Sequence, residues 1–261
     1  MSPLISPREA YIRQYHRSVV VLDVRKSDTF KSVHLSRAIH VKRDCLMGED
    51  PAIPLARSQL EHLLQQRGVN RDTSIILCDA RAGYDAAYLW LLLKHYNFND
   101  VSLIDGGIDG ILHDNLPTTT KSITPKPGTI MLNKTNPRPI ATYQDILQAA
   151  DDEDTLLLDV RSKDEFDGIK APPGSNPGRI KNSRHLDYRV AINPDNGNKL
   201  HHSSKLKKLY KDIYDYQNII VYCQIGFRSA FTHFVLETLL GHKAVKNYLG
   251  SWHDYDKRVN R

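Results

Sequence analysis

The chain contains two copies of one pattern, and this internal repeat constrains its fold more than any other feature. Each copy has an apolar run that ends in Asp-Val-Arg, and later a second apolar run and a glycine-containing turn. The matching strings, first copy before second, are Val19–Arg25 with Thr155–Arg161, Ser74–Leu77 with Asn218–Val221, and Asp105–Gly107 with Leu249–Ser251. Two copies of roughly 120 residues are too few and too long for a solenoid, so we predict a tandem domain duplication.

The elements inside each copy predict an α/β fold. Short apolar runs are typical of buried strands, and apolar residues at helical spacing follow them. Strands alternating with helices favour a mainly parallel sheet with helices on both faces in each domain. The expected helices span residues 58–64, with Ser58 and Glu61 as a capping box, and residues 85–96, 142–147, 204–214 and 229–240.

The boundary between the copies is visible in the composition. Residues 117–139 are rich in Thr, Pro, Lys and Asn, which is typical of a linker, and the apolar cluster Ile130–Leu132 within them is predicted to form a short strand. We therefore predict an N-terminal domain over residues 1–120, a linker over 121–140 and a C-terminal domain over 141–261. The second copy is about eight residues longer, and the loop Ala171–Gly178 is expected to hold the extra length.

The string Tyr222-Cys223-Gln224-Ile225-Gly226-Phe227-Arg228-Ser229 directly follows a predicted strand and precedes a predicted helix. A cysteine there lies where open α/β sheets bind ligands. Backbone N–H groups of a tight loop, the helix N-terminus and the cation of Arg228 would all lower the pKa of its thiol. A buried structural cysteine is the commoner fate of a lone Cys. The strand, the tight loop, Arg228 and the following helix occur together here, and this combination favours a reactive Cys223.

The first copy has no cysteine at the matching position. Counting back from Cys223 by the separation between Asn218 and Ser74 leads to Asp79. Cys78 lies one position earlier, at the end of the predicted strand, and we expect it to be a half-buried strand residue. The nucleophile is therefore predicted in the second copy alone.

Cys223, four residues and then Arg228-Ser229 resemble the active-site loop of the rhodanese-type sulfurtransferases. The loop and the later string Asn247–Trp252 are similar to two-domain bacterial and archaeal thiosulfate sulfurtransferases. The resemblance implies two rhodanese-like domains, the first without a nucleophile, and a cysteine that carries sulfane sulfur as a persulfide. It implies no metal or organic cofactor. Related phosphatases have five residues between Cys and Arg, so the shorter loop disfavours phosphatase or arsenate reductase chemistry.

Other charged residues have structural interpretations as well as functional ones. Asp159 and Arg161 are interpreted first as a local ion pair, because Asp23 and Arg25 repeat it in the first copy. The resemblance places this aspartate close to the catalytic loop, which keeps Asp159 as a candidate. Arg184 and His185 lie where the family has a second segment lining the cleft. A substrate-binding role and an exposed loop are equally compatible with that position.

The resemblance also implies that the first-copy residues Arg81, Gly83, Tyr84 and Asp85 face the active site across the domain interface. The histidines show no metal-ligand spacing, so no metal site is expected.

The net charge of the chain limits the classes of molecule that it is expected to bind. A net charge of +6 favours an anionic small molecule or an acidic partner, and no motif supports nucleic-acid binding. The absence of a leader and of an apolar run near about eighteen residues predicts a cytoplasmic chain without membrane contact. Three cysteines show neither a metal spacing nor a disulfide framework.

We predict a sulfurtransferase that moves sulfur from thiosulfate to cyanide or a thiol by a ping-pong route through Cys223. Arg228 would orient the loop and stabilise the anionic substrate, and Ser229 would donate a hydrogen bond toward the sulfur. The residues from Gln224 through Ile225 and Gly226 to Phe227 would supply the anion-binding nest.

Two alternatives stay open. One is a 3-mercaptopyruvate sulfurtransferase, because Gln224 replaces the basic residue that mammalian thiosulfate enzymes carry after the cysteine. Against this alternative, the chain lacks the Gly-Ser-Gly string that is typical of mercaptopyruvate enzymes after the cysteine. The other is a persulfide carrier or regulatory module that acts with a thioredoxin-like or sulfur-carrier protein.

Overall fold

The structure, a computed structural model, describes residues 2–80 and 83–259. The chain divides into two compact α/β units. The first unit comprises residues 1–48, 55–136 and 192–200, and the second comprises residues 49–54, 137–191 and 201–261. Residues 49–54 of the first sequence copy are therefore grouped with the second unit, and residues 192–200 of the second copy are grouped with the first unit.

The first unit is built on a parallel sheet. Among its described residues the sheet has five strands, in the order β1-β5-β4-β2-β3, and every neighbouring pair is parallel. The strands are β1 (Leu4–Ile5), β2 (Val19–Asp23), β3 (Ala38–His40), β4 (Ser74–Cys78) and β5 (Val101–Ile104). The helices are α1 (Pro7–Arg13), α2 (Ser27–Ser32), α3 (Arg57–Gln65), α4 (Tyr84–His95) and α5 (Gly107–His113), with the 3-10 helix η1 (Arg43–Leu46).

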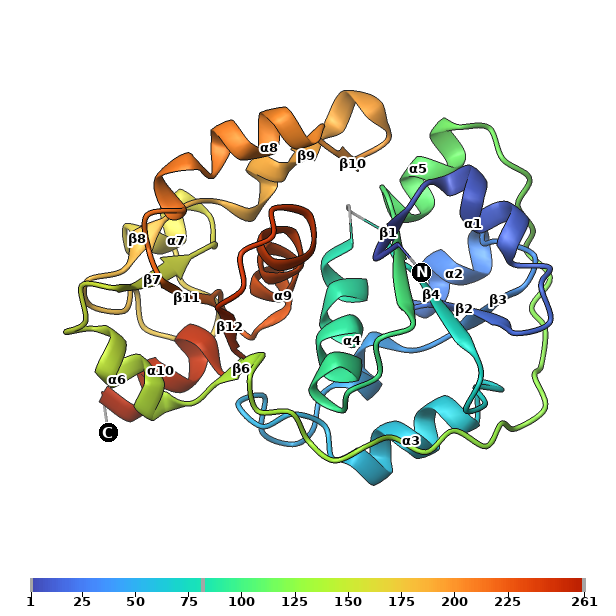
Figure 1. Ribbon diagram of the computed structural model, residues 1–261, viewed down its shortest axis with the longest axis horizontal. Helices are drawn as coiled ribbons and strands as arrows, with labels where there is room; N and C mark the ends of the chain where they lie inside the picture. Colours follow the sequence, from blue (N-terminus) through green and yellow to red (C-terminus); the bar gives the residue numbers. More distant parts are fainter. Residues whose placement is uncertain (1, 81–82, 260–261) are drawn as a thin grey trace. The chain divides into compact units, whose positions relative to one another are not determined.

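Helices cover both faces of this sheet. Ala10 of α1, Phe30 of α2 and Ile108 of α5 join one apolar cluster with strand residues of β2 and β4. Helix α4 packs on β4 and β5 from the other face (Figure 1). Parallel strands buried on both faces need apolar residues throughout, which is why Ile75, Ile76 and Leu77 are all buried.

The second unit repeats the same topology. Its described residues form a five-stranded parallel sheet in the order β6-β12-β11-β7-β8. The strands are β6 (Ile140–Ala141), β7 (Thr155–Asp159), β8 (Arg184–His185), β11 (Asn218–Tyr222) and β12 (Val245–Tyr248). The helices are α6 (Tyr143–Ala149), α7 (Lys163–Phe166), α8 (Ser203–Leu209), α9 (Phe227–Phe234) and α10 (Ser251–Val259), with the 3-10 helices η3 (Tyr188–Ala191) and η5 (Lys211–Ile213) and the π-helix η6 (Val235–Leu239).

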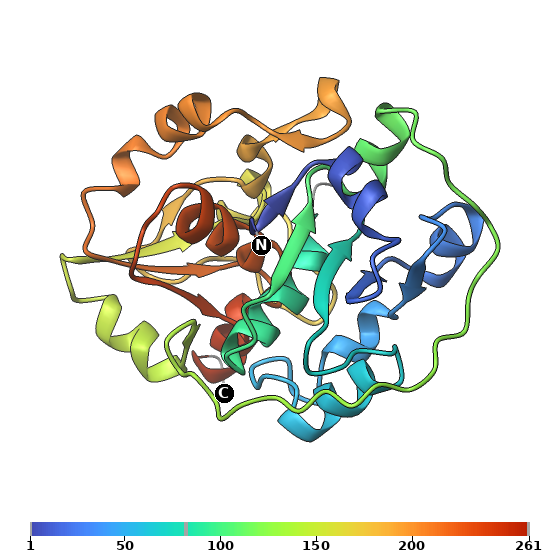
Figure 2. The same cartoon turned by 45° about the vertical axis from the view of Figure 1, so that its right-hand side comes forward.

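Helices α6 and α10 pack on one face of the second sheet through Ile146 and Trp252, and α9 packs on β11 and β12 (Figure 2). The remaining segment is an antiparallel hairpin of β9 (Ile192–Asn193) and β10 (Lys199–Leu200) around the 3-10 helix η4 (Pro194–Asn196), and it belongs to the first unit. The shared strand order confirms the predicted duplication and the α/β class.

Several local predictions need correction. The helix near Ser58 begins at Arg57, and its first-turn box is closed by Gln59, whose side chain accepts the backbone N–H of Ala56. Glu61 instead accepts the backbone N–H of Leu132.

Residues 130–132 form no strand, although Ile130 and Leu132 are buried. The helix after the cysteine begins at Phe227, two residues earlier than predicted. The predicted helix 204–214 is divided between α8 and η5. Within the described part of the chain, no helix is both long and apolar enough to cross a membrane.

Candidate active site

Cys223 is the first residue after β11, at the carboxyl edge of the second sheet. Its predecessor Tyr222 pairs with Asp159, the last residue of β7. Three residues separate Cys223 from Phe227, where α9 begins, and the intervening Gly226 has a φ of +84°. A Cβ on Gly226 would lie 2.8 Å from the carbonyl oxygen of Leu249. Glycine is therefore required by both the backbone conformation and the neighbouring strand end.

The hydroxyl of Ser251 holds the two ends of this loop. Its Oγ accepts the backbone N–H groups of Cys223 and Gly226, each at 3.1 Å, and donates to the carbonyl oxygen of Tyr248 at 2.7 Å. These two N–H groups are thus not available to a ligand. The predicted nest is correspondingly smaller: the N–H groups that reach the sulfur are those of Ile225 and Ser229.

The surroundings of the thiol favour its ionised form. Burial raises the pKa of Cys223, which is 1% exposed. The charge of Arg228, the hydroxyl of Ser229 and the two backbone N–H groups outweigh that effect, so the pKa lies below its ordinary value. Thiolate is the nucleophilic form of cysteine. The geometry therefore supports a reactive Cys223 and not a structural one.

Arg228 is held by a residue that the sequence analysis did not single out. Its Nη1 and Nη2 donate to the two carboxylate oxygens of Glu165 on α7, at 2.7 and 2.8 Å. Glu165 also accepts the backbone N–H and the hydroxyl of Ser162, which caps α7. Burial raises the pKa of Glu165, but Arg228 and Ser162 lower it to about 2. Glu165 thus fixes the guanidinium beside the cysteine.

Ser229 lies between the sulfur and a buried amide. Its Oγ is 3.5 Å from Cys223 Sγ and 2.8 Å from Asn247 Oδ1. Asn247, on β12, also donates through Nδ2 to the carbonyl oxygen of Gly226 at 3.0 Å. The predicted hydrogen bond between Ser229 and the sulfur is thus within reach, while Asn247 competes for the same hydroxyl proton.

The other predicted loop residues have distinct surroundings. Gln224 donates through Nε2 to Ser175 Oγ at 2.8 Å, so the loop inserted in the second copy contacts the cysteine loop. Ile225 is partly exposed, whereas Phe227 is 2% exposed and packs in the core. The backbone carbonyls of Cys223 and Gln224 accept the first N–H groups of α10.

Asp159 lies in a buried ion pair that both copies share. Its carboxylate receives Nε, Nη2 and the backbone N–H of Arg161, and both side chains are at most 1% exposed. Arg161 Nη2 also donates to the carbonyl oxygen of Gly178 at 2.8 Å. In the first copy Arg25 binds Asp23 in the same way and donates to the carbonyl oxygen of Val33. The pair ties a loop to the strand end in either copy.

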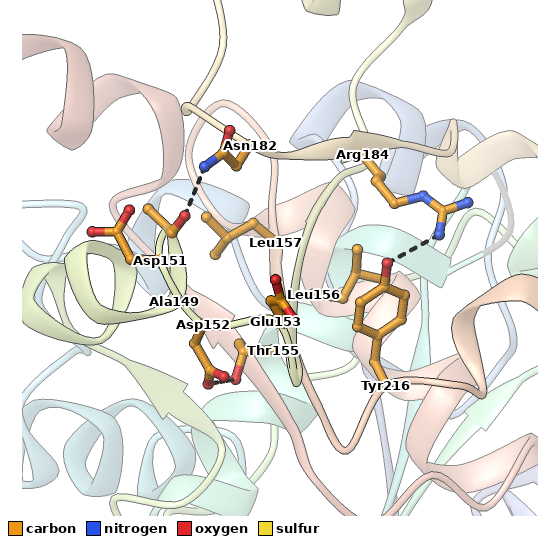
Figure 3. A pocket seen from close by; sticks show the side chains of 11 residues that line it. Ala149, Asp151, Asp152, Glu153, Thr155, Leu156, Leu157, Asn182, Arg184 and Tyr216 are labelled. Carbon is orange, nitrogen blue, oxygen red and sulfur yellow. Dashed lines mark hydrogen bonds between the residues drawn. The ribbon is translucent and has the colours of Figure 1, made fainter.

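The structure directs Arg184 away from the cysteine loop and places His185 at the carboxyl edge of the sheet, paired with Asp159. Arg184 Nη1 donates to the hydroxyl of Tyr216, which precedes β11, whereas Cys223 follows that strand. Figure 3 shows this side chain at a cavity of about 440 Å³ that is also lined by Thr155, the first residue of β7. This cavity therefore lies at the amino edge of the sheet. His185 Nε2 is 2.8 Å from the carbonyl oxygen of Arg161, as His40 Nε2 is from that of Arg25.

The first copy places a carboxylate where the second has its thiol. Asp79 follows β4 as Cys223 follows β11, and its Oδ2 accepts the backbone N–H groups of Asp85 and Ala86 at 2.9 and 3.0 Å. Burial and the charge of Asp85 raise the pKa of Asp79 well above its usual range. Cys78 is 1% exposed, more buried than predicted, and burial raises its pKa. Arg81 lies outside the residues that the structure describes.

These features define a cysteine-loop protein built from two copies of one α/β domain, and comparisons with known proteins agree. The Rhodanese-like domain model matches residues 6–114 and 142–258. The chain therefore belongs to the rhodanese sulfurtransferase family.

Two curated relatives and one solved structure illustrate the similarity. The chain is 36% identical over 210 residues to the Mycolicibacterium smegmatis protein named "Putative thiosulfate sulfurtransferase", covering 77% of this chain and 74% of that one. It is 29% identical to the sulfur carrier protein TtuD of Thermus thermophilus, over 80% and 78% of the two chains. The crystal structure of SseA from Escherichia coli, described as a 3-mercaptopyruvate sulfotransferase, matches with a TM-score of 0.83 at 19% identity, over 97% and 99% of the chains. That identity supports the fold alone.

Proposed function

We propose that the chain moves sulfane sulfur from thiosulfate to cyanide or a thiol through a persulfide on Cys223. The observation that carries the proposal is the sulfur at the carboxyl edge of the sheet, where two backbone N–H groups and Arg228 lower the pKa of the thiol. The M. smegmatis relative, named for thiosulfate, supports the choice of donor. All the chemistry needed is nucleophilic substitution at sulfur, so no external oxidant or reductant enters either step.

In the first step the thiolate of Cys223 attacks the outer sulfur of thiosulfate. A bond forms between Sγ and that sulfur, the sulfur–sulfur bond of thiosulfate breaks, and its electron pair leaves with sulfite. The resulting persulfide carries its charge on the outer sulfur. Arg228 supplies a cation that acts on the sulfur, and Glu165 keeps its guanidinium in place.

In the second step an acceptor removes the outer sulfur. Cyanide or a thiolate attacks it, the bond to Sγ breaks, and the electron pair returns to Cys223 as thiolate. The products are thiocyanate or a persulfide of the acceptor. The N–H groups of Ile225 and Ser229 stabilise the returning thiolate, because they already point at Sγ before the reaction.

A persulfide carrier is the second candidate. One observation favours it: the similarity to a relative named as a sulfur carrier. A carrier uses the same loop and differs in its donor and acceptor, which are then proteins such as a thioredoxin-like or sulfur-carrier partner. The cysteine chemistry is identical in the two proposals.

The test is cyanide-dependent formation of thiocyanate, with thiosulfate and separately with 3-mercaptopyruvate as donor. We expect turnover with thiosulfate by the wild type and a loss of at least about a thousandfold in Cys223→Ser, because serine is a far weaker nucleophile at neutral pH. Cys45→Ser is the matched control, since Cys45 is exposed and should leave turnover unchanged.

The donors separate the alternatives. Faster turnover with 3-mercaptopyruvate would retain the mechanism and change the substrate. If neither donor gave more thiocyanate than Cys223→Ser, the small-donor proposal would fail, and the carrier proposal would be tested by loading Cys223 from a protein persulfide.

A further inference from the structure

The side chains of Cys223, Ser229 and Asn247 form a buried polar cluster. Ser229 and Asn247 are both 0% exposed, and Cys223 is 1% exposed. Asn247 is a middle residue of β12 and pairs with Val221 of β11 in the parallel sheet. A polar side chain buried inside a sheet is costly unless it is fully hydrogen-bonded, and Asn247 uses both ends of its amide.

The direction of each hydrogen bond follows from the chemistry of the groups. Gly226 offers a carbonyl oxygen, so the Asn247 atom that faces it at 3.0 Å must be the NH₂ donor. The other end, Oδ1, can only accept. Ser229 has one hydroxyl proton and two acceptors, Oδ1 at 2.8 Å and Cys223 Sγ at 3.5 Å, and the shorter contact favours donation to Asn247 while the thiol is protonated.

This arrangement has a consequence for the sulfur. When the Ser229 proton is committed to Asn247, the Oγ presents lone pairs to Cys223 Sγ, 3.5 Å away. A thiol can donate its S–H to those lone pairs, but a thiolate cannot. Ionisation of Cys223 is matched by a turn of the Ser229 hydroxyl toward the sulfur, which leaves Oδ1 of Asn247 without that donor.

We propose that Asn247 is a positioning residue that holds the Ser229 proton away from Cys223 and so opposes ionisation of the thiol until the hydroxyl turns. This inference rests on the proposed role of Cys223 as nucleophile, but not on any particular sulfur donor. Asn247 acts through Ser229 and does not touch the sulfur in any contact described above.

The first copy supports the assignment, because it carries none of the three groups. Asp79 stands in place of Cys223, and Ala86, the third residue of α4, stands in place of Ser229, the third residue of α9. Leu103, which pairs with Leu77 as Asn247 pairs with Val221, stands in place of Asn247. The sheet therefore accepts leucine at this position, and the buried amide accompanies the cysteine.

The experiment measures the rate at which iodoacetamide alkylates Cys223 as a function of pH, followed by the mass of the Cys223 peptide. Asn247→Leu copies the residue of the first copy. It frees the Ser229 proton for the thiolate, so the midpoint of the profile should fall and alkylation below the midpoint should be about tenfold faster. Ser229→Ala should raise the midpoint. In the double variant the Asn247→Leu effect should disappear, leaving the profile of Ser229→Ala.

A midpoint that stays or rises in Asn247→Leu would overturn the proposal, as would a fall that persists in the Ser229→Ala background. Asn247→Asp provides a second test if the leucine variant does not fold. The carboxylate binds the Ser229 proton more strongly and adds a negative charge, so the midpoint should rise, and by less when Ser229 is alanine. An equal rise in both backgrounds contradicts the proposal. Alkylation needs no sulfur donor, so a failure of the thiocyanate assay leaves this test intact.

Discussion

Single residues distinguish the loop after the central strand of the second copy from its counterpart in the first copy. In each copy a backbone N–H group of the helix after the central strand points at the first loop residue. In the first copy the N–H of Asp85 binds the carboxylate of Asp79, and in the second the N–H of Ser229 reaches Cys223 Sγ. The backbone thus favours an anion at this position in both copies. The charged side chains decide the difference, because Arg228, the second residue of α9, stands where the first copy has Asp85, the second residue of α4.

Glu165 gives a prediction at the same scale. Glu165→Gln should destabilise the protein by about 2 kcal/mol near neutral pH, because it leaves the partly buried Arg228 without its carboxylate. The folded-state pKa of Glu165 is about 2, below the ordinary value of 4.5, so the stabilisation is present above pH 4.5 and is lost as the pH falls toward about 2. Urea unfolding of wild type and variant across this range measures the difference.

A matched control is Asp167→Asn on the neighbouring turn. It removes the exposed ion pair with Lys163, which should contribute at most about 1 kcal/mol at any pH. If Glu165→Gln cost no more than this control at neutral pH, or if its cost grew as the pH fell, the described role of Glu165 would be wrong.

At the scale of elements, the turn between β11 and α9 depends on one glycine. Gly226→Ala should cost about 1–3 kcal/mol and slow alkylation of Cys223, because the new Cβ meets Leu249 as well as an unfavourable φ. Gly241 has a similar φ of +76°, and a Cβ added there would meet no described atom within 4 Å, so Gly241→Ala isolates the backbone strain. Thermal unfolding and alkylation rates compare the two. Equal losses in both variants would show that the contact with Leu249 is unimportant.

The elements also show what the sequence could predict. The central strands and the helix after each of them follow from apolar runs of the right length, and these predictions are confirmed. The short strand at Ile130–Leu132 was wrong because its apolar residues are buried by packing beside α3, where Gln65 and Glu61 bind their backbone. Three consecutive apolar residues do not by themselves distinguish a strand from an irregular segment that packs against a helix.

The site was predictable where its residues are adjacent in sequence. Cys223, Arg228 and Ser229 lie in one short stretch that spans the loop and the start of α9, whereas Glu165 and Asn247 reach it from other elements. Each of these two left a signal in the comparison of copies: Glu165 stands where the first copy has Thr29, and Asn247 where it has Leu103.

The resemblance placed Arg184 at a segment that lines the cleft, and an exposed loop was equally compatible with its position. Its side chain reaches Tyr216, toward the amino edge of the sheet, and the rotamer of a long exposed side chain is not readable from sequence.

At the scale of the whole molecule, duplication provides an internal reference for separating structural residues from functional ones. Both units have the same strand order and the same Asp-Arg pair at the end of a central strand. Features common to the copies therefore serve the fold, and features confined to the second are candidates for chemistry. The contacts of Asp159 and His185 belong to the shared set, because Asp23 and His40 repeat them.

Whether Cys223 carries the sulfur can be read from the mass of the protein after incubation with thiosulfate. Peptides containing Cys45, Cys78 and Cys223 are compared after digestion without reductant. We expect an added sulfur atom on the Cys223 peptide, removed by cyanide, and none on the Cys78 peptide, where burial raises the pKa of the thiol. Sulfur on Cys78 or Cys45, with Cys223 unmodified, would contradict the proposed role of Cys223.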